Sequence, residues 1–254
     1  MIANPSLTFS TNTPKQRSGF TLGELVIATA IVMVIAVVAF TLLLPVQRAR
    51  EPARRSQCRN NLKQIALALF NYHDQYHAFP PAYTVDADGK PLHSWRTLIL
   101  PYMDQKALYD KIDLTKPWDD PVNVEVFKSI SFDPYRCPSE PGPASHTTYL
   151  AVVTSNSCLR HGESARISDI KDGLANTLMV TEVDSEHAVP WMAPRDADES
   201  LFLAISPTSK LVHTGGVQAV FADGTVRFLN ADLTAEIRRT LITIDGKDYQ
   251  TGFF

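Results

Sequence analysis

Two residues near the C-terminus have types and a spacing that could support acid–base chemistry. Nine residues separate His213 from Asp223, which is followed by Gly224. A histidine oriented by an aspartate is the pair that activates a nucleophile in many hydrolases. The sequence contains no Gly-x-Ser-x-Gly or other nucleophile pattern to complete it. We therefore favour a structural role, with Asp223 as a turn residue and His213 as a hydrogen-bonded residue at the start of a strand.

A second pair of histidines has the spacing of a metal site. His73 and His77 are four residues apart, and this spacing places two imidazoles on one face of a helix, as zinc sites require. No cysteine or glutamate at ligand spacing completes the set, and Asp74 belongs to a different face of the helix. The sequence therefore predicts no metal here.

The third unusual residue is Glu24, at the edge of an apolar run that carries no charge from Leu25 to Val46. A helix over residues 20–46 would be roughly 40 Å long, enough to cross a hydrocarbon layer of roughly 30 Å with some tilt. The run is too long for a secretory signal peptide, whose apolar core is about 7 to 15 residues. We therefore predict a leader over residues 1–19 and a transmembrane helix over residues 20–46.

The residues around Glu24 resemble the prepilin processing motif of type IV pilins and type II secretion pseudopilins. They read Gly19-Phe20-Thr21-Leu22-x-Glu24-Leu25 ahead of the apolar helix. The resemblance implies that a prepilin peptidase cuts between Gly19 and Phe20 on the cytoplasmic face and methylates the new amino terminus at Phe20. It also implies that Glu24 neutralises the Phe20 ammonium as subunits pack helix against helix. Opposite charges attract strongly in a low dielectric, which agrees with this role.

The charges on either side of the apolar run disagree with that orientation. The leader carries only two positive charges, whereas five arginines follow the run with only Glu51 against them. These arginines are Arg48, Arg50, Arg54, Arg55 and Arg59. The positive-inside rule alone would place the C-terminal side in the cytoplasm. The resemblance instead implies a single-pass inner-membrane protein with a cytoplasmic N-terminus and a periplasmic or extracellular head.

The helix is predicted to continue past the membrane over residues 47–78. Apolar residues recur there at helical spacing and form one stripe that should pack under the head. They are Leu62, Ile65, Ala66, Leu69 and Phe70. We expect a bend near Pro45 and Pro52, and we expect Phe79-Pro80-Pro81 to end the helix.

Residues 79–254 read as one α+β head. Residues 94–111 have helical spacing interrupted by Pro101, and residues 121–130 favour a short helix. Residues 149–153 and 177–181 are short β-prone runs. An Asp-Gly pair lies between two alternating stretches within residues 217–229, which is a strong hairpin signal. The fold class is therefore a long N-terminal transmembrane helix extended into a pilin-like head with an antiparallel sheet and short helices.

The head carries a second resemblance, to a large bacterial family of pilin-like proteins that joins a prepilin N-terminus to a head of unassigned activity. The matching segments are Cys58-x-Asn60-Asn61-Leu62-Lys63-Gln64, Asn71-Tyr72-His73-Asp74, Phe79-Pro80, Ser94-Trp95-Arg96, Arg136-Cys137-Pro138-Ser139, Asp172-Gly173-x-x-Asn176-Thr177 and His213-x9-Asp223-Gly224. The last is the family's C-terminal signature, and its role is unknown. The family supplies no catalytic residues to carry over, so the resemblance implies an envelope role only.

Three cysteines in a head outside the cytoplasm suggest one disulfide and one spare thiol. Three pairings are open, as is a state with all three thiols reduced and buried. We favour Cys58 with Cys137, because this bond would link the long helix to the head. The alternative pairing is Cys137 with Cys158.

Composition narrows the ligand classes. The net charge of -3 argues against a nucleic-acid partner, whose domain would be markedly basic. An acidic stretch offers hard oxygen ligands at Asp184, Glu186, Asp196, Asp198 and Glu199. By analogy with the calcium in a late loop of major pseudopilins, calcium could bind there, but no EF-hand spacing occurs. The sequence itself predicts no cofactor.

These observations favour a pseudopilin-like structural subunit, not an enzyme, whose partners are prepilin peptidase, the inner membrane and other pilin-like subunits. A membrane-tethered binding module that does not polymerise is the alternative. An anchored hydrolase that uses His213 and Asp223 is a third hypothesis.

Overall fold

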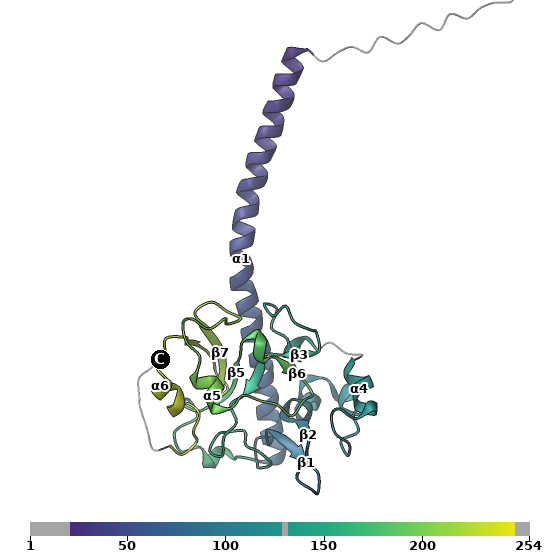
Figure 1. Cartoon of the computed structure of the whole chain (residues 1–254), viewed down its shortest axis with the longest axis vertical. Coiled ribbons are helices and arrows are strands. Elements are labelled where there is room, and N and C mark those ends of the chain that lie inside the picture. Colours follow the sequence, from purple (N-terminus) through teal and green to yellow (C-terminus); the bar gives the residue numbers. More distant parts are fainter. Residues whose placement is uncertain (1–20, 129–131, 247–254) are drawn as a thin grey trace, which may run out of the picture. The chain divides into compact units, whose positions relative to one another are not determined.

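The computed structural model describes residues 21–128 and 132–246, with side chains excepted over residues 41–50 (Figure 1). The helices are α1 (Leu22–Tyr76), α2 (Trp95–Leu98), α3 (Lys106–Tyr109), α4 (Pro121–Lys128), α5 (Glu199–Leu203) and α6 (Ala235–Thr240). The strands are β1 (Tyr83–Val85), β2 (Pro91–Ser94), β3 (His146–Thr147), β4 (Tyr149–Ala151), β5 (Leu178–Glu182), β6 (Val189–Pro190), β7 (Gly216–Phe221) and β8 (Val226–Asn230). Short 3-10 helices cover Leu100–Met103, Asp133–Tyr135, Ile167–Asp169 and Ser185–His187. The fold class is therefore α+β, as predicted.

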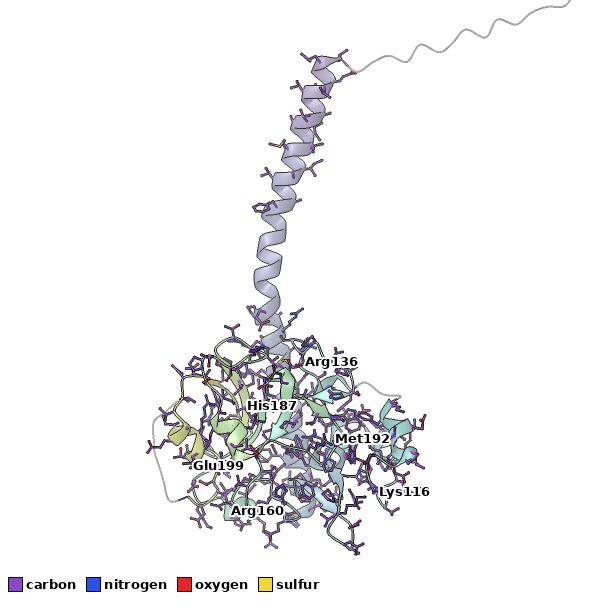
Figure 2. The ribbon with its side chains drawn as sticks, in the orientation of Figure 1. Lys116, Arg136, Arg160, His187, Met192 and Glu199 are labelled. Atoms are coloured by element: carbon purple, nitrogen blue, oxygen red, sulfur yellow. A yellow bond between two sulfur atoms is a disulfide. The ribbon has the colours of Figure 1, made fainter. Side chains whose placement is uncertain are left out.

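The chain forms two compact units, Met1–Ala49 and Arg50–Phe254. In the first unit every described side chain from residue 21 to residue 40 is exposed (Figure 2). The segment Leu22–Phe40 is long and apolar enough to cross a membrane. A signal sequence would pass the same test of length and composition. The helix assignment continues through Pro45 and Pro52, so neither proline ends α1.

The second unit is built on a four-stranded antiparallel sheet with the strand order β4-β5-β7-β8. Two small two-stranded sheets, β1-β2 and β3-β6, lie outside it. The β7-β8 hairpin is the one predicted from the Asp-Gly pair, and its last register pair before the turn joins Val220 to Val226. Gly224 has a φ of 81°, a left-handed conformation that favours glycine.

The two faces of this sheet belong to two separate clusters of buried side chains. Tyr149, Ala151 and Val220 lie in the cluster that contains the apolar stripe of α1. Leu150 and Val152 lie in the other cluster, which contains Phe202 of α5 and Leu241 after α6. Successive residues of a strand point to opposite faces, so alternation along β4 supplies both clusters. The sheet is therefore covered by α1 on one face and by α5 and α6 on the other.

The stripe on α1 is buried as the sequence predicted. Leu62, Ile65, Ala66 and Leu69 are buried, and Phe70 packs against them. The helix ends at Tyr76, two residues before the predicted end. The helical pattern over residues 94–111 is divided into α2, a 3-10 turn that contains Pro101, and α3. The proline removes a backbone donor, which explains the interruption.

A buried arginine holds the middle of the head together. Arg96, on α2, is fully buried and its Nη1 lies 2.7 Å from Oδ1 of the buried Asp196. Its guanidinium also donates to the carbonyl oxygens of Tyr149, Trp191, Ala193 and Arg195. Asp196 Oδ1 further accepts from Trp95 Nε1 and from Ala151 N. The charge pair therefore ties α2, β4 and the loop before α5 to one another.

We predict that Arg96→Met destabilises the head by about 3–5 kcal/mol, because it leaves the Asp196 carboxylate buried without its countercharge. Urea unfolding of the full chain in detergent, followed by near-ultraviolet circular dichroism of the tryptophans, measures this change. Arg239→Met is the matched control, because Arg239 pairs with Glu199 at the surface and exposed pairs contribute at most about 1 kcal/mol. Equal losses in the two variants would contradict the central role of Arg96.

Candidate functional site around His213 and the disulfide

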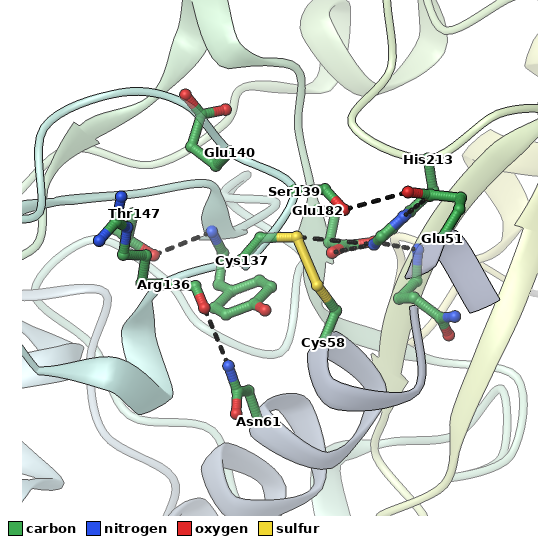
Figure 3. The surroundings of a disulfide bond; sticks show 12 residues. Glu51, Cys58, Asn61, Arg136, Cys137, Ser139, Glu140, Thr147, Glu182 and His213 are labelled. Atoms are coloured by element: carbon green, nitrogen blue, oxygen red, sulfur yellow. Dashed lines mark hydrogen bonds and ion pairs between the residues drawn. A yellow bond between two sulfur atoms is a disulfide. The ribbon is translucent and has the colours of Figure 1, made fainter. Parts of the chain in front are cut away.

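The structure pairs Cys58 with Cys137, the bond that we favoured from the sequence (Figure 3). Cys58 lies on α1 and Cys137 lies in the loop after the 3-10 turn Asp133–Tyr135, with a Cα–Cα distance of 5.3 Å. Asn61, one turn further along α1, donates from Nδ2 to the carbonyl oxygens of Asp133 and Arg136. The disulfide and this amide together attach the loop to the helix.

The third cysteine is a buried free thiol. Burial raises the pKa of Cys158 to about 12. The thiolate is the reactive form of cysteine, so at neutral pH Cys158 acts as a small apolar side chain.

His213 lies beside the disulfide and is 1% exposed. Its Nδ1 is 2.9 Å from Oε1 of Glu51 on α1, and its Nε2 is 3.5 Å from Oε1 of Glu182 on β5 (Figure 3). Nε2 also lies 3.5 Å from the Sγ atom of Cys137. The imidazole therefore bridges two carboxylates and faces the disulfide.

Electrostatics favour the protonated form of this histidine. Burial lowers the pKa of His213, but hydrogen bonds and charge attraction from Glu182 and then Glu51 outweigh it, so the pKa is raised above the ordinary value. An imidazolium carries an N–H on both ring nitrogens, so one N–H faces each carboxylate. The site is therefore a buried cluster of charged side chains beside the Cys58–Cys137 disulfide.

Glu182 is the deepest acid of this cluster, at 1% exposure. Its Oε2 accepts from the backbone N–H of Gln218 on β7 at 2.8 Å. Within the described residues its Oε1 has no hydrogen bond, and it lies 3.5 Å from Nε2 of His213 as an ion pair. Strand β5 places this carboxylate because Glu182 is its last residue, beside the start of β7 in the sheet.

The hydrolase hypothesis required His213 to pair with Asp223, and the structure separates them. Asp223 accepts from Thr225 N and Oγ1 and pairs with Arg227 at 2.9 Å. It is a turn residue, as the favoured interpretation predicted, and His213 lies just before β7, where it forms an isolated bridge with Gly216. The orienting partners of the histidine are Glu51 and Glu182, which the sequence analysis did not identify for this role.

The signature His213-x9-Asp223-Gly224 spans strand β7, with the histidine before the strand and the Asp-Gly turn after it. Both ends contact α1. His213 reaches Glu51, and the neighbouring Thr214 carbonyl accepts from Arg55 Nη2 at 2.8 Å. At the other end, a Cβ atom at Gly224 would lie 3.1 Å from the ring of Phe70. The signature therefore fixes the hairpin along α1.

The other candidate sites do not form ligand clusters. His77 follows the end of α1 with a φ of 56°, so it does not share a helical face with His73, whose ring packs on Phe79. The acidic stretch is engaged elsewhere: Asp184 with His187, Asp196 with Arg96, Asp198 at the start of α5, and Glu199 with Arg239. The histidine pair and the acidic stretch therefore lack the shared geometry that a metal would need.

One metal-type group is present within residues 21–128 and 132–246, and it is the cluster at the disulfide. Single ligand atoms of Cys58, Cys137, Glu182 and His213 all lie within 4.8 Å of one another. These residues come from α1, a loop, β5 and the segment before β7, so no local spacing in the sequence could reveal them.

The residues of the processing motif are described only in part, because Gly19 and Phe20 lie outside the described residues. Glu24 lies in the first turn of α1, where Oε2 accepts from Thr21 N at 2.9 Å and from Thr21 Oγ1 at 3.0 Å. Glu24 N in turn donates to Thr21 Oγ1 at 3.4 Å. This reciprocal arrangement is a capping box, so Glu24 has a partner within its own chain.

The fold and the site define a class of protein: an α+β head built on the second half of a helix whose first half is of membrane-spanning type. The chain belongs to the family described as "Protein of unknown function (DUF1559)", whose model matches residues 47–204, well over half of the sequence. No curated protein and no solved structure matches the chain. The match includes Glu51, Cys58, Cys137 and Glu182 and ends before His213.

We predict that, while the disulfide is intact, loss of the His213 proton makes the head less stable at higher pH. The folded pKa is raised, so the folded state holds the proton more tightly than the unfolded state does. The stabilisation is full below the unfolded pKa of about 6.5 and is lost as the pH rises through the folded value. Urea unfolding midpoints measured from about pH 5 to about pH 9 give the slope of stability against pH. This range extends roughly two units to either side of the ordinary histidine pKa.

The slope should shrink in His213→Gln and persist in His161→Gln, because His161 is exposed. The comparison between variants isolates His213 from His93 and His146, whose pKa values burial lowers. An identical slope in wild type and His213→Gln would show that the buried imidazole does not carry the proton in the folded state.

Proposed function

We propose that this protein is a pilin-like structural subunit, cut between Gly19 and Phe20 by a prepilin peptidase, methylated at Phe20, and assembled through α1 in the cell envelope. The observation that carries the proposal is the exposed apolar helix Leu22–Phe40, which begins within the processing motif and holds Glu24 in its first turn.

The exposed apolar surface of this helix indicates contact with lipid or with another protein. Large apolar side chains from Leu22 to Phe40 are about half exposed or more, and exposed apolar surface of this extent marks a membrane or protein interaction site. In lipid the surface is solvated by acyl chains, and against other helices it packs side chain to side chain. A filament subunit uses both environments in turn, first as a membrane precursor and then as part of a helix bundle.

The disulfide supports a head outside the cytoplasm. Disulfides persist in oxidising compartments and are rare in cytosolic proteins. The Cys58–Cys137 bond lies within the second unit, after the apolar helix, so it favours the orientation with a cytoplasmic N-terminus. This argument opposes the one from the five arginines and agrees with the processing motif.

We further propose that the head is not an enzyme and that its partners are other pilin-like subunits and the inner membrane. The cluster around His213 is closed to solvent at His213 and Glu182. A substrate would have to open the contact between α1 and β7 to reach either side chain.

Mass spectrometry of the protein purified from membranes should show N-methyl-Phe20 as the first residue. The peptidase both cleaves and methylates, so the two changes should occur together, and Gly19→Leu should keep the leader attached. A mature chain that retains Met1 would favour the membrane-tethered binding module instead.

Three variants separate the role of the Glu24 charge from the role of Glu24 in capping the helix. The assay measures crosslinks between membrane-inserted subunits. If Glu24 neutralises the Phe20 ammonium, Glu24→Gln and Glu24→Ala should both abolish crosslinks between subunits, while Thr21→Ala should retain them. The amide of Gln can still accept from Thr21 N, so it preserves the cap and removes only the charge. Full crosslinking in Glu24→Gln with loss in Thr21→Ala would mean that Glu24 serves the helix end alone.

A further inference from the structure

We infer that the cluster at the disulfide is a zinc site when the disulfide is reduced. The two thiolates of Cys58 and Cys137, the Nε2 atom of His213 and the Oε1 atom of Glu182 supply four donors within 4.8 Å of one another. Zinc sites in proteins are tetrahedral and take sulfur, imidazole nitrogen and carboxylate oxygen. This site does not depend on processing or filament assembly.

His213 is already oriented as a metal ligand. Metal-binding histidines donate their other ring N–H to a carboxylate or carbonyl, which fixes the tautomer. Here Nδ1 lies 2.9 Å from Oε1 of Glu51, so the neutral ring carries its hydrogen on Nδ1 and presents the Nε2 lone pair to Cys137 and Glu182. Glu51 would therefore support the metal without binding it.

Glu182 is the ligand whose burial most needs an explanation. It is 1% exposed, and its Oε1 has no hydrogen bond within the described part of the chain. A buried carboxylate is costly unless a countercharge accompanies it. The His213 imidazolium supplies that charge beside the disulfide, and a divalent metal supplies it when the thiols are free, so Glu182 is compensated in both states.

The donor set selects the metal. Soft thiolates with imidazole suit zinc, whereas calcium and magnesium prefer sites made entirely of oxygen donors. Both cysteines and His213 are buried, so the site is closed and its four protein ligands leave no position for water. Closed four-ligand sites are structural, so the metal would replace the disulfide as the link between α1 and the loop at Cys137.

A dithiol can convert the disulfide state into the reduced state that binds zinc, and the electrons and protons of this step balance. The dithiol loses two electrons and two protons and becomes a disulfide, while the Cys58–Cys137 bond breaks and each sulfur gains one electron and one proton. Zinc then displaces both thiol protons, and His213 releases its Nε2 proton to solvent where it is protonated. In reoxidation the two thiolates pass two electrons to an external disulfide, which takes up two protons and becomes a dithiol, and the Cys58–Cys137 bond forms again and releases the metal.

Cobalt titration of the full chain in detergent tests the site. The protein is reduced with a phosphine, freed of it under argon, and titrated with Co²⁺. We expect one equivalent to bind with a thiolate-to-cobalt charge-transfer band and the ligand-field bands of tetrahedral cobalt, and Zn²⁺ to displace it. The oxidised protein should bind none at the same concentration. Absence of these bands in the reduced protein, or equal bands in both forms, would overturn the proposal.

Three variants assign the ligands. The double variant Cys58→Ser/Cys137→Ser should lose the charge-transfer band, and Cys158→Ala should retain it. Glu51→Ala should keep the stoichiometry and weaken zinc binding about 10–100-fold, because it removes the support of His213. Loss of the band in Cys158→Ala with retention in Cys58→Ser/Cys137→Ser would place the thiolate elsewhere and reject the site.

A stability measurement on wild-type protein tests the site without any variant, so its result does not depend on whether a variant folds. Zn²⁺ should raise the urea midpoint of the reduced head and leave that of the oxidised head unchanged, because a ligand stabilises only the state that binds it. Equal shifts in both forms, or no shift in the reduced form, would contradict the inference.

Discussion

The head depends on one packing arrangement, the seating of the central sheet on the second half of α1. The stripe of Leu62, Ile65 and Leu69 supplies one wall of the core, and β4, β5 and β7 supply the other. Burial of such side chains stabilises a fold by about 1.5–3 kcal/mol each, so this contact contributes several kcal/mol to the stability of the head. The cluster at His213 exists because β7 runs along the same helix.

Two clusters of buried charged residues lie beside this core. Arg96 joins Asp196 to four backbone carbonyl groups, and His213 joins Glu51 to Glu182. Buried ion pairs contribute little net stability, but removal of one partner is severely destabilising. They therefore act chiefly to reject other arrangements of the same strands. An alternative register of β7 would leave the Glu182 carboxylate without its bond from Gln218 N.

Local patterns predicted the local features of this molecule. The stripe on α1, the Asp-Gly hairpin and the broken helical segment around Pro101 each follow from residues close together in the chain. The favoured disulfide followed from the need to attach the helix to the head. Glu51 and Glu182 escaped prediction because they reach His213 from positions 162 and 31 residues away in the chain. Two-residue strands such as β3 and β6 escaped because they carry no alternation to read.

The nine-residue spacing between His213 and Asp223 acquires a physical meaning from these contacts. Strand β7 occupies residues 216–221 of this interval, so its length largely sets the distance between the buried histidine and the turn. Both ends are fixed to α1, by Glu51 and by the close approach of Gly224 to Phe70. Side chains alternate along a strand, so one extra residue would exchange the faces on which Ala219 and Val220 lie. It would also move His213 away from the disulfide. The length of the signature therefore couples the register of the sheet to the position of the buried cluster.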